Sequence, residues 1–361
     1  MNYYFHIPFC RSKCGYCAFY SKPTMDSALF DQYLAKLKQD LDAAPWEPAE
    51  TIYLGGGTPT IFDSGRLNRL FELLTQKLAP DSKTEITVEA NPETLDEEKI
   101  KLIRQFANRL SLGVQSFAAS HRKTLGRVCS QTALNTAIEL IQEMNFPKWN
   151  IDLIYAIPGE TGQDFFEDLK LAVHAGATHL SCYSLTAEEG SKLGKSFQLN
   201  EEQAAELWKA IPTQIAPDHF RRYEISNYAL AGQECRHNQN VWRGGLLRGF
   251  GPGAASFDGQ IRYTQVPSLA EWLAEAPPEI DEIPLPARLN EIFAVNLRTT
   301  EGWTPELWQK VPGADSWEQR QAKIRQAAAE TTSELFKITP ERIALSDQGL
   351  LFWNTIAGIL L

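Results

Sequence analysis

The chain has few cysteines, no long apolar segment and no excess of positive charge. Six cysteines in 361 residues are too few for the disulfide framework of a small secreted protein. The longest apolar stretch, residues 349–361, is interrupted by Asn354 and Thr355 and is too short to cross a bilayer. The formal net charge of −10 argues against general nucleic-acid binding, which needs a basic surface.

The first residues, MNYYFHIPF, are typical of a β-strand and not of a signal peptide, because no basic segment is followed by an apolar one. We therefore expect no leader, no transmembrane segment and a cytoplasmic location. With 361 residues, 43% of them hydrophobic, the chain can bury the core of a barrel-sized domain and carry an appendage.

Three of the six cysteines lie close together in the run HIPFCRSKCGYCAFYS. Cys10, Cys14 and Cys17, spaced C-x3-C-x2-C, can each bind one iron of a [4Fe–4S] cluster, because soft thiolates suit iron–sulfur clusters. The fourth iron is then free to be chelated by the amino and carboxylate groups of S-adenosylmethionine (SAM). Zinc is the competitor, but a closed zinc site needs a fourth ligand. Cys129, Cys182 and Cys235 are single and distant, so the spacing favours the cluster.

The first two thirds of the chain alternate short β-rich runs with amphipathic stretches of helical period. Six such βα units imply a parallel sheet with right-handed crossovers, either a barrel or an open doubly wound sheet. The expected strands are Tyr3–Ile7, Thr51–Leu54, Glu85–Glu89, Arg109–Val114, Asn150–Ile154 and Thr178–Ser184, and the expected helices are Asp26–Ala43, Ser64–Leu78, Asp96–Phe106, Thr132–Met144, Gln163–Ala175 and Glu201–Ile215.

Unusual residues fall at or near the carboxyl ends of consecutive expected strands. The cysteines follow the first strand, residues 55–59 (GGGTP) follow the second, and Glu89 closes the third. Gln115 closes the fourth and Asp152 lies in the fifth. Barrel enzymes build their sites on this face, so the pattern favours a partial (β/α)6 TIM-like barrel of the α/β class.

The βα rhythm ends near residue 217, and the composition then divides the chain. We expect a barrel domain with its extension over residues 1–276, with the core barrel at about 1–216. A connector with four prolines follows at 277–286, and a small, mainly helical domain fills 287–361.

Several single residues have a functional and a structural interpretation. Gly56, Gly57 and Thr58 would let the backbone approach SAM closely, or they form a tight turn. Glu89 would be costly to bury unpaired, so either ligand hydroxyls such as those of a ribose or a salt bridge should satisfy it. Gln115, Arg127 and Asp152 would line the same mouth, although Arg127 could equally lie on the surface.

Three further residues are placed less firmly by the pattern. Tyr4 could face into or out of the barrel, and Phe19 could cover the cluster, cover an adenine or join the core. His237, in CRHNQNVW, could ligate haem iron, but a lone histidine is more often structural.

Seven segments together resemble the HemN/HemW branch of radical SAM proteins, and the likeness to the HemW haem chaperone family is strongest. The segments are HIPFCRSKCGYCAFYS, YLGGGTPT, TVEANPETL, LSLGVQSF, NIDLIYAIPGET, YEISNYA and HNQNVW. The resemblance implies that Cys10, Cys14 and Cys17 ligate the cluster and that Tyr4, Gly56, Gly57, Thr58 and Glu89 contact SAM. Gln115, Arg127 and Asp152 match positions that hold a second SAM in the coproporphyrinogen enzymes.

Two functions compete within this branch. The chain resembles the chaperones, which bind haem and deliver it to haem-accepting apoproteins, in its HNQNVW run and in having Phe19 where the dehydrogenases have another cysteine. It also has only nine residues before Cys10, whereas the dehydrogenases carry an N-terminal extension. The alternatives are an oxygen-independent coproporphyrinogen III dehydrogenase and a haem-modifying radical SAM methyltransferase.

The chain departs from the pattern of the branch at three positions. Val241 replaces a tyrosine, Ala18 an aspartate and Ala255 a histidine, so each departure removes a polar or ligating group. The resemblance leaves a homodimer open and identifies neither the electron donor nor the haem acceptor.

Overall fold

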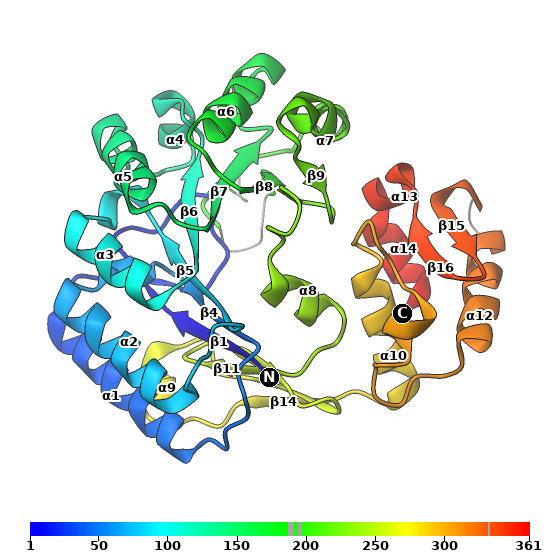
Figure 1. The fold of residues 1–361 in the computed structure, drawn as a ribbon, viewed down its shortest axis with the longest axis horizontal. Coiled ribbons are helices and arrows are strands. Elements are labelled where there is room, and N and C mark those ends of the chain that lie inside the picture. Colours follow the sequence, from blue (N-terminus) through cyan, green and yellow to red (C-terminus); the bar gives the residue numbers. More distant parts are fainter. Residues whose placement is uncertain (187–190, 194–196, 331–332) are drawn as a thin grey trace.

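The computed structural model describes residues 1–186, 191–193, 197–330 and 333–361. One curved sheet of twelve strands is flanked by helices, and a smaller C-terminal part packs beside it (Figure 1). In the sheet the strand order is β14-β13-β12-β11-β1-β4-β5-β6-β7-β8-β10-β9, so its two ends are not paired with each other. The predicted partial barrel is confirmed.

The six expected βα units are all present, with boundaries within two residues of those expected. The parallel strands are β1 (Asn2–Ile7), β4 (Thr51–Gly56), β5 (Glu85–Ala90), β6 (Arg109–Gln115), β7 (Lys148–Tyr155) and β8 (His179–Ser184). The helices on the outer face are α1 (Ser27–Ala43), α2 (Ser64–Leu78), α3 (Glu97–Phe106), α5 (Gln131–Met144), α6 (Gly162–His174) and α7 (Glu201–Ile215), with the short α4 (Ala119–Thr124) before α5 (Figure 1).

Local sequence explains these elements. Helix α2 begins after Asp63, whose side chain accepts a hydrogen bond from the Arg66 N–H, because an N-cap carboxylate satisfies a free amide of the first turn. Its buried residues recur three or four apart and face the sheet: Leu67, Leu70, Phe71, Leu74 and Leu78. In β1, Tyr3, Phe5 and Ile7 are fully buried in the apolar core. Residues that alternate with such positions in a strand face the barrel interior.

The segment after residue 217 completes the sheet at both ends. On one side β11 (Leu247–Phe250) pairs in parallel with β1, and β12 (Ala255–Phe257), β13 (Ile261–Thr264) and β14 (Glu279–Glu282) follow as an antiparallel meander that helix α9 (Leu269–Leu273) interrupts. On the other side β10 (Asn227–Ala229) and β9 (Arg221–Arg222) pair antiparallel beyond β8. The Pro-rich segment 277–286 therefore contains an edge strand.

Helix α8 (Arg236–Trp242) lies within the curve of the sheet (Figure 1). Its side chains contact the first residues of the barrel strands. Asn240 donates to the Asn2 amide oxygen at 3.0 Å, and the His237 N–H donates to Glu85 at 3.0 Å. Since Asn2 and Glu85 begin β1 and β5, α8 covers the N-terminal end of the barrel.

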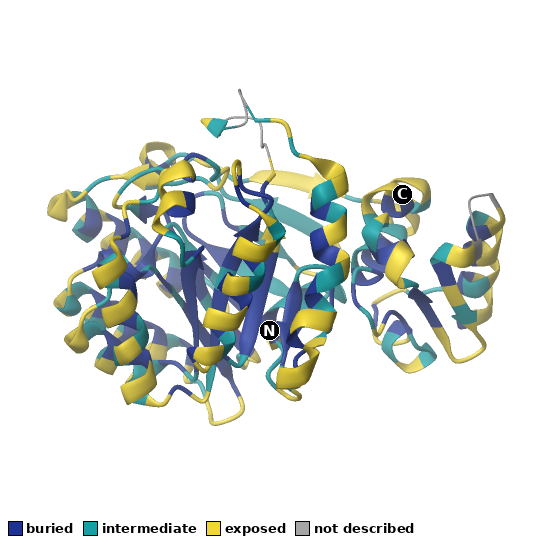
Figure 2. Ribbon diagram, turned by 90° about the horizontal axis from the view of Figure 1, so that it is seen from above, coloured by how far each residue is buried: buried dark blue, intermediate teal, exposed yellow. Residues whose placement is uncertain are grey.

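The C-terminal part is small and mainly helical, as predicted, and its buried apolar side chains are continuous with the core of the barrel (Figure 2). It contains α10 (Leu285–Asn296), α11 (Pro305–Trp308), α12 (Trp317–Glu330), the hairpin β15 (Phe336–Thr339) and β16 (Arg342–Leu345), α13 (Asp347–Leu351) and α14 (Trp353–Leu360). The rings of Phe293, Trp303 and Trp308 pack with centroids 5.1–5.7 Å apart. Arg298 joins this part to the barrel through an ion pair of 2.8 Å with the buried Glu224. No helix in the described ranges has the length and hydropathy of a bilayer-spanning segment.

Candidate functional site

A pocket of about 650 Å³ opens at the carboxyl ends of the barrel strands. All but two of the predicted site residues line it: Cys10, Cys14, Cys17, Phe19, Gly56, Gly57, Thr58, Glu89, Gln115, Arg127 and Asp152. The structure therefore brings together side chains from the loops and ends of five strands. Tyr4 and His237 do not line the pocket.

The cysteine loop is held in place mainly by backbone hydrogen bonds. Its ends form a short parallel pair, β2 (Phe9–Cys10) and β3 (Lys22–Pro23). In its middle the Gly15 N–H donates to the Leu125 carbonyl at 2.9 Å, and the Thr58 N–H donates to the Phe9 carbonyl at 2.7 Å. The loop is thus fixed on one side by the end of β4 and on the other by the segment after α4.

The three thiols fit a polynuclear cluster better than a single metal ion. All three are free and half-buried, and Cys10 Sγ accepts a hydrogen bond from Thr58 Oγ1 at 3.8 Å. Within the described ranges no three His, Cys, Asp or Glu side chains are arranged to hold one metal ion. Three separate soft donors on one pocket wall suit the separate irons of a [4Fe–4S] cluster. Burial raises the pKa of Cys10 and Cys17, so without metal these two side chains are protonated, and binding of iron would have to displace the proton.

The glycines that end β4 are required by close packing. A Cβ at Gly57 would lie 2.5 Å from the Phe9 carbonyl oxygen, and one at Gly55 would lie 2.7 Å from the Glu89 carboxylate. Gly56 has a φ of +99°, and a Cβ there would collide with the His6 imidazole. The glycine run therefore lets this strand end lie directly against the cysteine loop.

Glu89 is held as a hydrogen-bond acceptor at the pocket wall. Tyr53 donates its hydroxyl to one carboxylate oxygen at 2.7 Å, and the Gly56 N–H donates to the other at 3.1 Å. Burial raises the pKa of Glu89 to about 7, with a further increase from the nearby Asp152, while the Tyr53 hydroxyl opposes the shift. Among the described residues no cation lies within 4.0 Å of this carboxylate, so there Glu89 is satisfied by the Tyr53 hydroxyl and the Gly56 N–H and not by a salt bridge.

Arg127 is buried in the pocket wall and does not lie on the surface. Its Nη2 donates to Asn91 Oδ1 at 2.9 Å and to the Gly113 carbonyl at 2.5 Å, and Glu93 lies 3.9 Å away. Its Nε has no hydrogen-bond partner in the part of the chain that the structure describes. A ligand acceptor in the pocket could satisfy this remaining donor.

Gln115 and Asp152 face the pocket from adjacent strands. Gln115 has a φ of +70° where the register between β6 and β7 shifts, an unusual conformation for a residue other than glycine. Asp152 accepts hydrogen bonds from Asn150 at 2.8 Å and Ser111 at 3.3 Å, and burial raises its pKa. The Asp152 side chain is therefore oriented before any ligand binds.

Phe19 and Ala18 lie at the open side of the pocket. The Phe19 side chain is 71% exposed and belongs to the mouth of the pocket, not to the core. The Lys13 ammonium donates to the Phe19 carbonyl at 2.5 Å, which holds this turn of the loop. An exposed aromatic ring beside three thiols can cover a ligand that enters the pocket.

Tyr4 faces the barrel interior behind the pocket wall. Its hydroxyl lies 3.1 Å from His6 Nδ1, and its ring lies against Tyr53 with centroids 6.1 Å apart. Contact between Tyr4 and SAM stays a prediction.

His237 lies in a closed niche at the opposite end of the barrel. Its Nδ1 is 2.7 Å from Thr51 Oγ1, its ring packs 5.0 Å from the ring of Tyr53, and burial lowers its pKa to about 4. Val241, on the same helix, and Ala255, in β12, are half-buried and also outside the pocket. Haem ligation by His237 stays a prediction, and it requires the imidazole to leave this niche.

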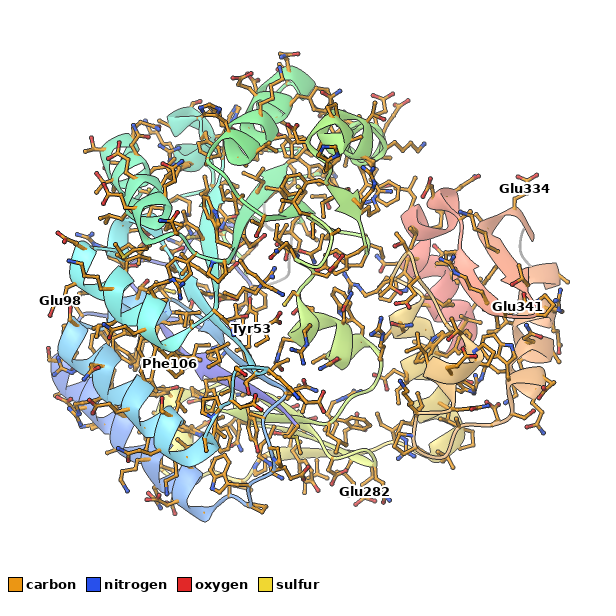
Figure 3. All side chains as sticks on the ribbon, in the orientation of Figure 1. Tyr53, Glu98, Phe106, Glu282, Glu334 and Glu341 are labelled. Carbon is orange, nitrogen blue, oxygen red and sulfur yellow. The ribbon has the colours of Figure 1, made fainter. Side chains whose placement is uncertain are left out.

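Sequence analysis missed other residues that line the pocket. Asn91 connects two predicted positions, because its amide donates to Thr58 Oγ1 at 2.7 Å and accepts from Arg127. Tyr53, labelled in Figure 3 on the inner side of the sheet, orients Glu89. The signal was present in both cases: Asn91 stands two residues after Glu89, and Tyr53 alternates with core positions of β4.

Comparisons with known proteins agree with this arrangement. The profile of the radical SAM superfamily matches residues 4–172. The haem chaperone HemW of Lactococcus lactis is 34% identical over 283 residues, which are 76% of this chain and 74% of that protein. HemW of Mycobacterium tuberculosis is 37% identical over 292 residues, again 76% of this chain and 74% of that protein. The coproporphyrinogen III oxidase HemN of Escherichia coli, a radical SAM enzyme, shares the fold with a TM-score of 0.85 and 20% identity, over 99% of this chain and 89% of that one.

Proposed function

The chain belongs to the HemW family of radical SAM proteins, and on this premise we propose that it binds haem and transfers it to acceptor proteins. The observation that carries the proposal is the 34–37% identity to haem chaperones over three quarters of both chains. The pocket agrees with it, because the thiols and the polar residues predicted for SAM line one cavity.

We assign the cofactor-binding roles by chemistry. Cys10, Cys14 and Cys17 would ligate a [4Fe–4S] cluster, which when bound supplies an electron to SAM. The backbone of Gly56 and Gly57 lies against the cysteine loop, where its polar groups can bind the methionyl end of SAM. Glu89 presents two oxygens to the pocket, and a ribose has two hydroxyls that can donate to them.

The remaining pocket residues would complete the binding site. The Thr58 hydroxyl is hydrogen-bonded to both Cys10 and Asn91, so it connects the residues proposed for the cluster with those proposed for SAM. Gln115, Arg127 and Asp152 would hold a second SAM or another polar ligand on the far wall. Phe19 would exclude water at the mouth.

Oxygen-independent coproporphyrinogen III dehydrogenase is the second candidate, because the fold matches HemN over nearly the whole chain. At 20% identity that likeness extends to the fold alone. The additional cysteine of the dehydrogenases is replaced in this chain by Phe19, which has no ligating group. We therefore place haem transfer first.

The setting of the transfer follows from the same chemistry. We propose a cytoplasmic location, since a reducing compartment keeps the three thiols available to iron. Haem-accepting apoproteins would be the partners. A homodimer and an electron donor stay predictions.

The test is an anaerobic haem titration of the protein with its cluster reconstituted. The Soret band should saturate near one haem per chain, and mixing with apomyoglobin should then shift the band to that of the holo acceptor. Coproporphyrinogen III and SAM are offered in a parallel reaction. Absence of saturable haem binding, with coproporphyrinogen and SAM consumed together, would establish the dehydrogenase instead.

A further inference from the structure

The pocket extends below the cofactor residues toward the N-terminal end of the barrel. Cross-strand pairing places Tyr53 of β4, Thr87 of β5 and Arg109 of β6 side by side. Thr87 lies two residues before Glu89 on the same strand. We call this region the lower chamber; its lining residues are Tyr53, Thr87, Arg109, Ser111, Asn150, His179, Ser181, Cys235 and Asn238. Most of these side chains are polar, although apolar side chains are the usual filling of a barrel interior.

Arg109 is a buried cation without a close counter-charge. Arg109 is only 2% exposed, and among the described residues its guanidinium makes one hydrogen bond, from Nη1 to the Gln233 carbonyl at 2.9 Å. Among the described residues no carboxylate lies within 4.0 Å of its guanidinium. A buried charge normally has a partner, so this arginine needs an explanation.

The nearest acid is shared between two cations. Glu85 accepts hydrogen bonds on one oxygen from the His237 N–H at 3.0 Å and from Cys235 Sγ at 3.8 Å. Its other oxygen has no hydrogen-bond partner among the described residues, and Lys148 lies 4.0 Å from it. Lys148 and Arg109 together carry one more positive charge than Glu85 can balance.

Two other titratable groups of the chamber are neutral. Burial raises the pKa of Cys235 to about 11 and lowers that of His179, so at neutral pH the first is a thiol and the second an uncharged imidazole. His179 is also bonded at both ring nitrogens, to Asn150 at 2.6 Å and to Tyr223 at 2.8 Å. Neither group supplies a negative charge to Arg109, and the carboxylate of Asp152, at the upper edge of the chamber, is bonded to Ser111 and Asn150.

Two further donors stand beside Arg109. Thr87 is 1% exposed, lines the chamber, and its hydroxyl has no hydrogen-bond partner among the described residues. Asn238 lines the chamber from α8. A buried hydroxyl without a partner is unusual in a folded protein, and here it lies on the strand next to the guanidinium of Arg109.

We propose that the lower chamber binds the carboxylate group of a slender ligand, with Arg109 as its counter-charge and Thr87 as an additional donor. Guanidinium groups bind carboxylates through paired hydrogen bonds. Two ligands of this protein family carry such a group on a flexible chain: a second SAM, through an aminocarboxylate that does not bind the cluster, and haem, through its propionates. The haem source rests on the proposed function, whereas the SAM source rests on family membership alone.

The experiment compares each ligand with an analogue that lacks the free carboxylate. Haem is paired with haem dimethyl ester and SAM with decarboxylated SAM, and dissociation constants are measured with cluster-reconstituted wild type, Arg109→Gln and Arg109→Lys. Arg69→Gln, which removes one charge from an exposed position on α2, is the matched control. Decarboxylated SAM also loses its contact with the cluster, but this loss is the same in every variant. The informative quantity is therefore the change, between wild type and the Arg109 variants, in the ratio of the two dissociation constants.

We expect wild type to prefer one free carboxylate over its analogue, and Arg109→Gln to reduce that preference about tenfold to a hundredfold. Arg109→Lys should retain part of it, and Arg69→Gln all of it. The pair that responds identifies the source of the carboxylate. If neither haem nor haem dimethyl ester binds, the proposed function is wrong. The comparison of SAM with decarboxylated SAM then still tests the chamber.

The proposal is overturned if no pair shows a preference that depends on Arg109. A second variant guards against misfolding of the arginine variants. Thr87→Val keeps the shape of the side chain and removes only the unpartnered hydroxyl, so it should lower the affinity for the free carboxylate several-fold. Unchanged affinity in Thr87→Val and equal affinities of wild type for both members of each pair would each count against the chamber.

Discussion

The Tyr53 hydroxyl lies 2.7 Å from the Glu89 carboxylate and donates a hydrogen bond across β4 and β5. This bond keeps the pKa of Glu89 at about 7 against a stronger upward shift from burial. The charge of Glu89 thus depends on its neighbour in the adjacent strand.

A pH dependence of SAM binding follows from this pair. An ionised carboxylate accepts two ribose hydroxyls better than a protonated one, so affinity should rise as pH increases through about 7. Tyr53→Phe removes a donor that stabilises the ionised form, and the midpoint should move to higher pH. Calorimetric titration of SAM from pH 6 to 9 measures the midpoint; an identical profile in Tyr53→Phe would contradict this role of the hydroxyl.

Cys14→Ser should abolish the brown chromophore of the reconstituted protein, because serine oxygen is a poor ligand for iron–sulfur clusters. Iron and sulfide content and the visible spectrum are the measurements. Cys182→Ala, which changes a buried cysteine of β8, is the control and should keep the cluster. A Cys14→Ser protein with full iron and sulfide would refute the ligand assignment.

Gly56→Ala should destabilise the fold by about 2 kcal/mol or more, since it combines backbone strain with a collision at His6. Gly358→Ala is the matched control. This glycine lies in α14 with open space around it, so alanine should stabilise the helix by about 0.5–1 kcal/mol. Denaturant unfolding of both variants should give changes of opposite sign, and changes of the same sign would contradict the packing.

The buried carboxyl group of Glu160 should make the stability of the fold depend on pH. Its side chain is fully buried beside His121, one carboxylate oxygen accepts no hydrogen bond from any described residue, and burial raises its pKa to about 8. Below about pH 4.5 the group is protonated in both folded and unfolded chains. As pH rises to 8, the unfolded chain releases this proton first, so stability falls.

Glu160→Gln should remove this dependence and, at pH 8, stabilise the protein by roughly 2–4 kcal/mol. Glu167→Gln changes an exposed residue of α6 and should leave the pH profile as in wild type. Chemical unfolding at pH 5 and pH 8 provides the measurement. Equal losses of stability between these pH values in wild type and Glu160→Gln would show that the buried carboxyl is not the cause.

His237→Ala should lower the free energy of unfolding by about 2–4 kcal/mol, because it removes the hydrogen bond to Thr51 and leaves a cavity beside Tyr53. Denaturant unfolding measures this loss. If the imidazole also ligates haem, the Soret band of the haem-loaded variant will shift. A folded variant with an unchanged Soret band and affinity would contradict the ligand prediction.

Features with a local signal could be predicted from the sequence. The cysteine spacing, the glycine turn and the helix periods are all read within about twenty residues, and the expected βα units agree with the structure. Glu89 was recognised as a buried carboxylate at a strand end.

Features that depend on long-range register could not be predicted. Nothing near Leu247 indicates that it pairs with Asn2, so the strand that flanks β1 was missed. The direction of Tyr4 and the burial of Arg127 depend on neighbours from other strands. The niche of His237 forms only when α8 covers the barrel, and a sequence pattern does not contain that contact.

The position of β1 has a consequence for synthesis of the chain. This strand pairs with β4 on one side and with β11 on the other, and β11 is made some 240 residues later than β1. While the ribosome is still translating the intervening units, one edge of β1 has no partner, and unpaired edges attract other chains. A fragment that stops near residue 216 would keep that edge permanently open. We therefore expect the nascent barrel to depend on a chaperone or on fast translation to avoid pairing with other chains until residue 250 has left the exit tunnel.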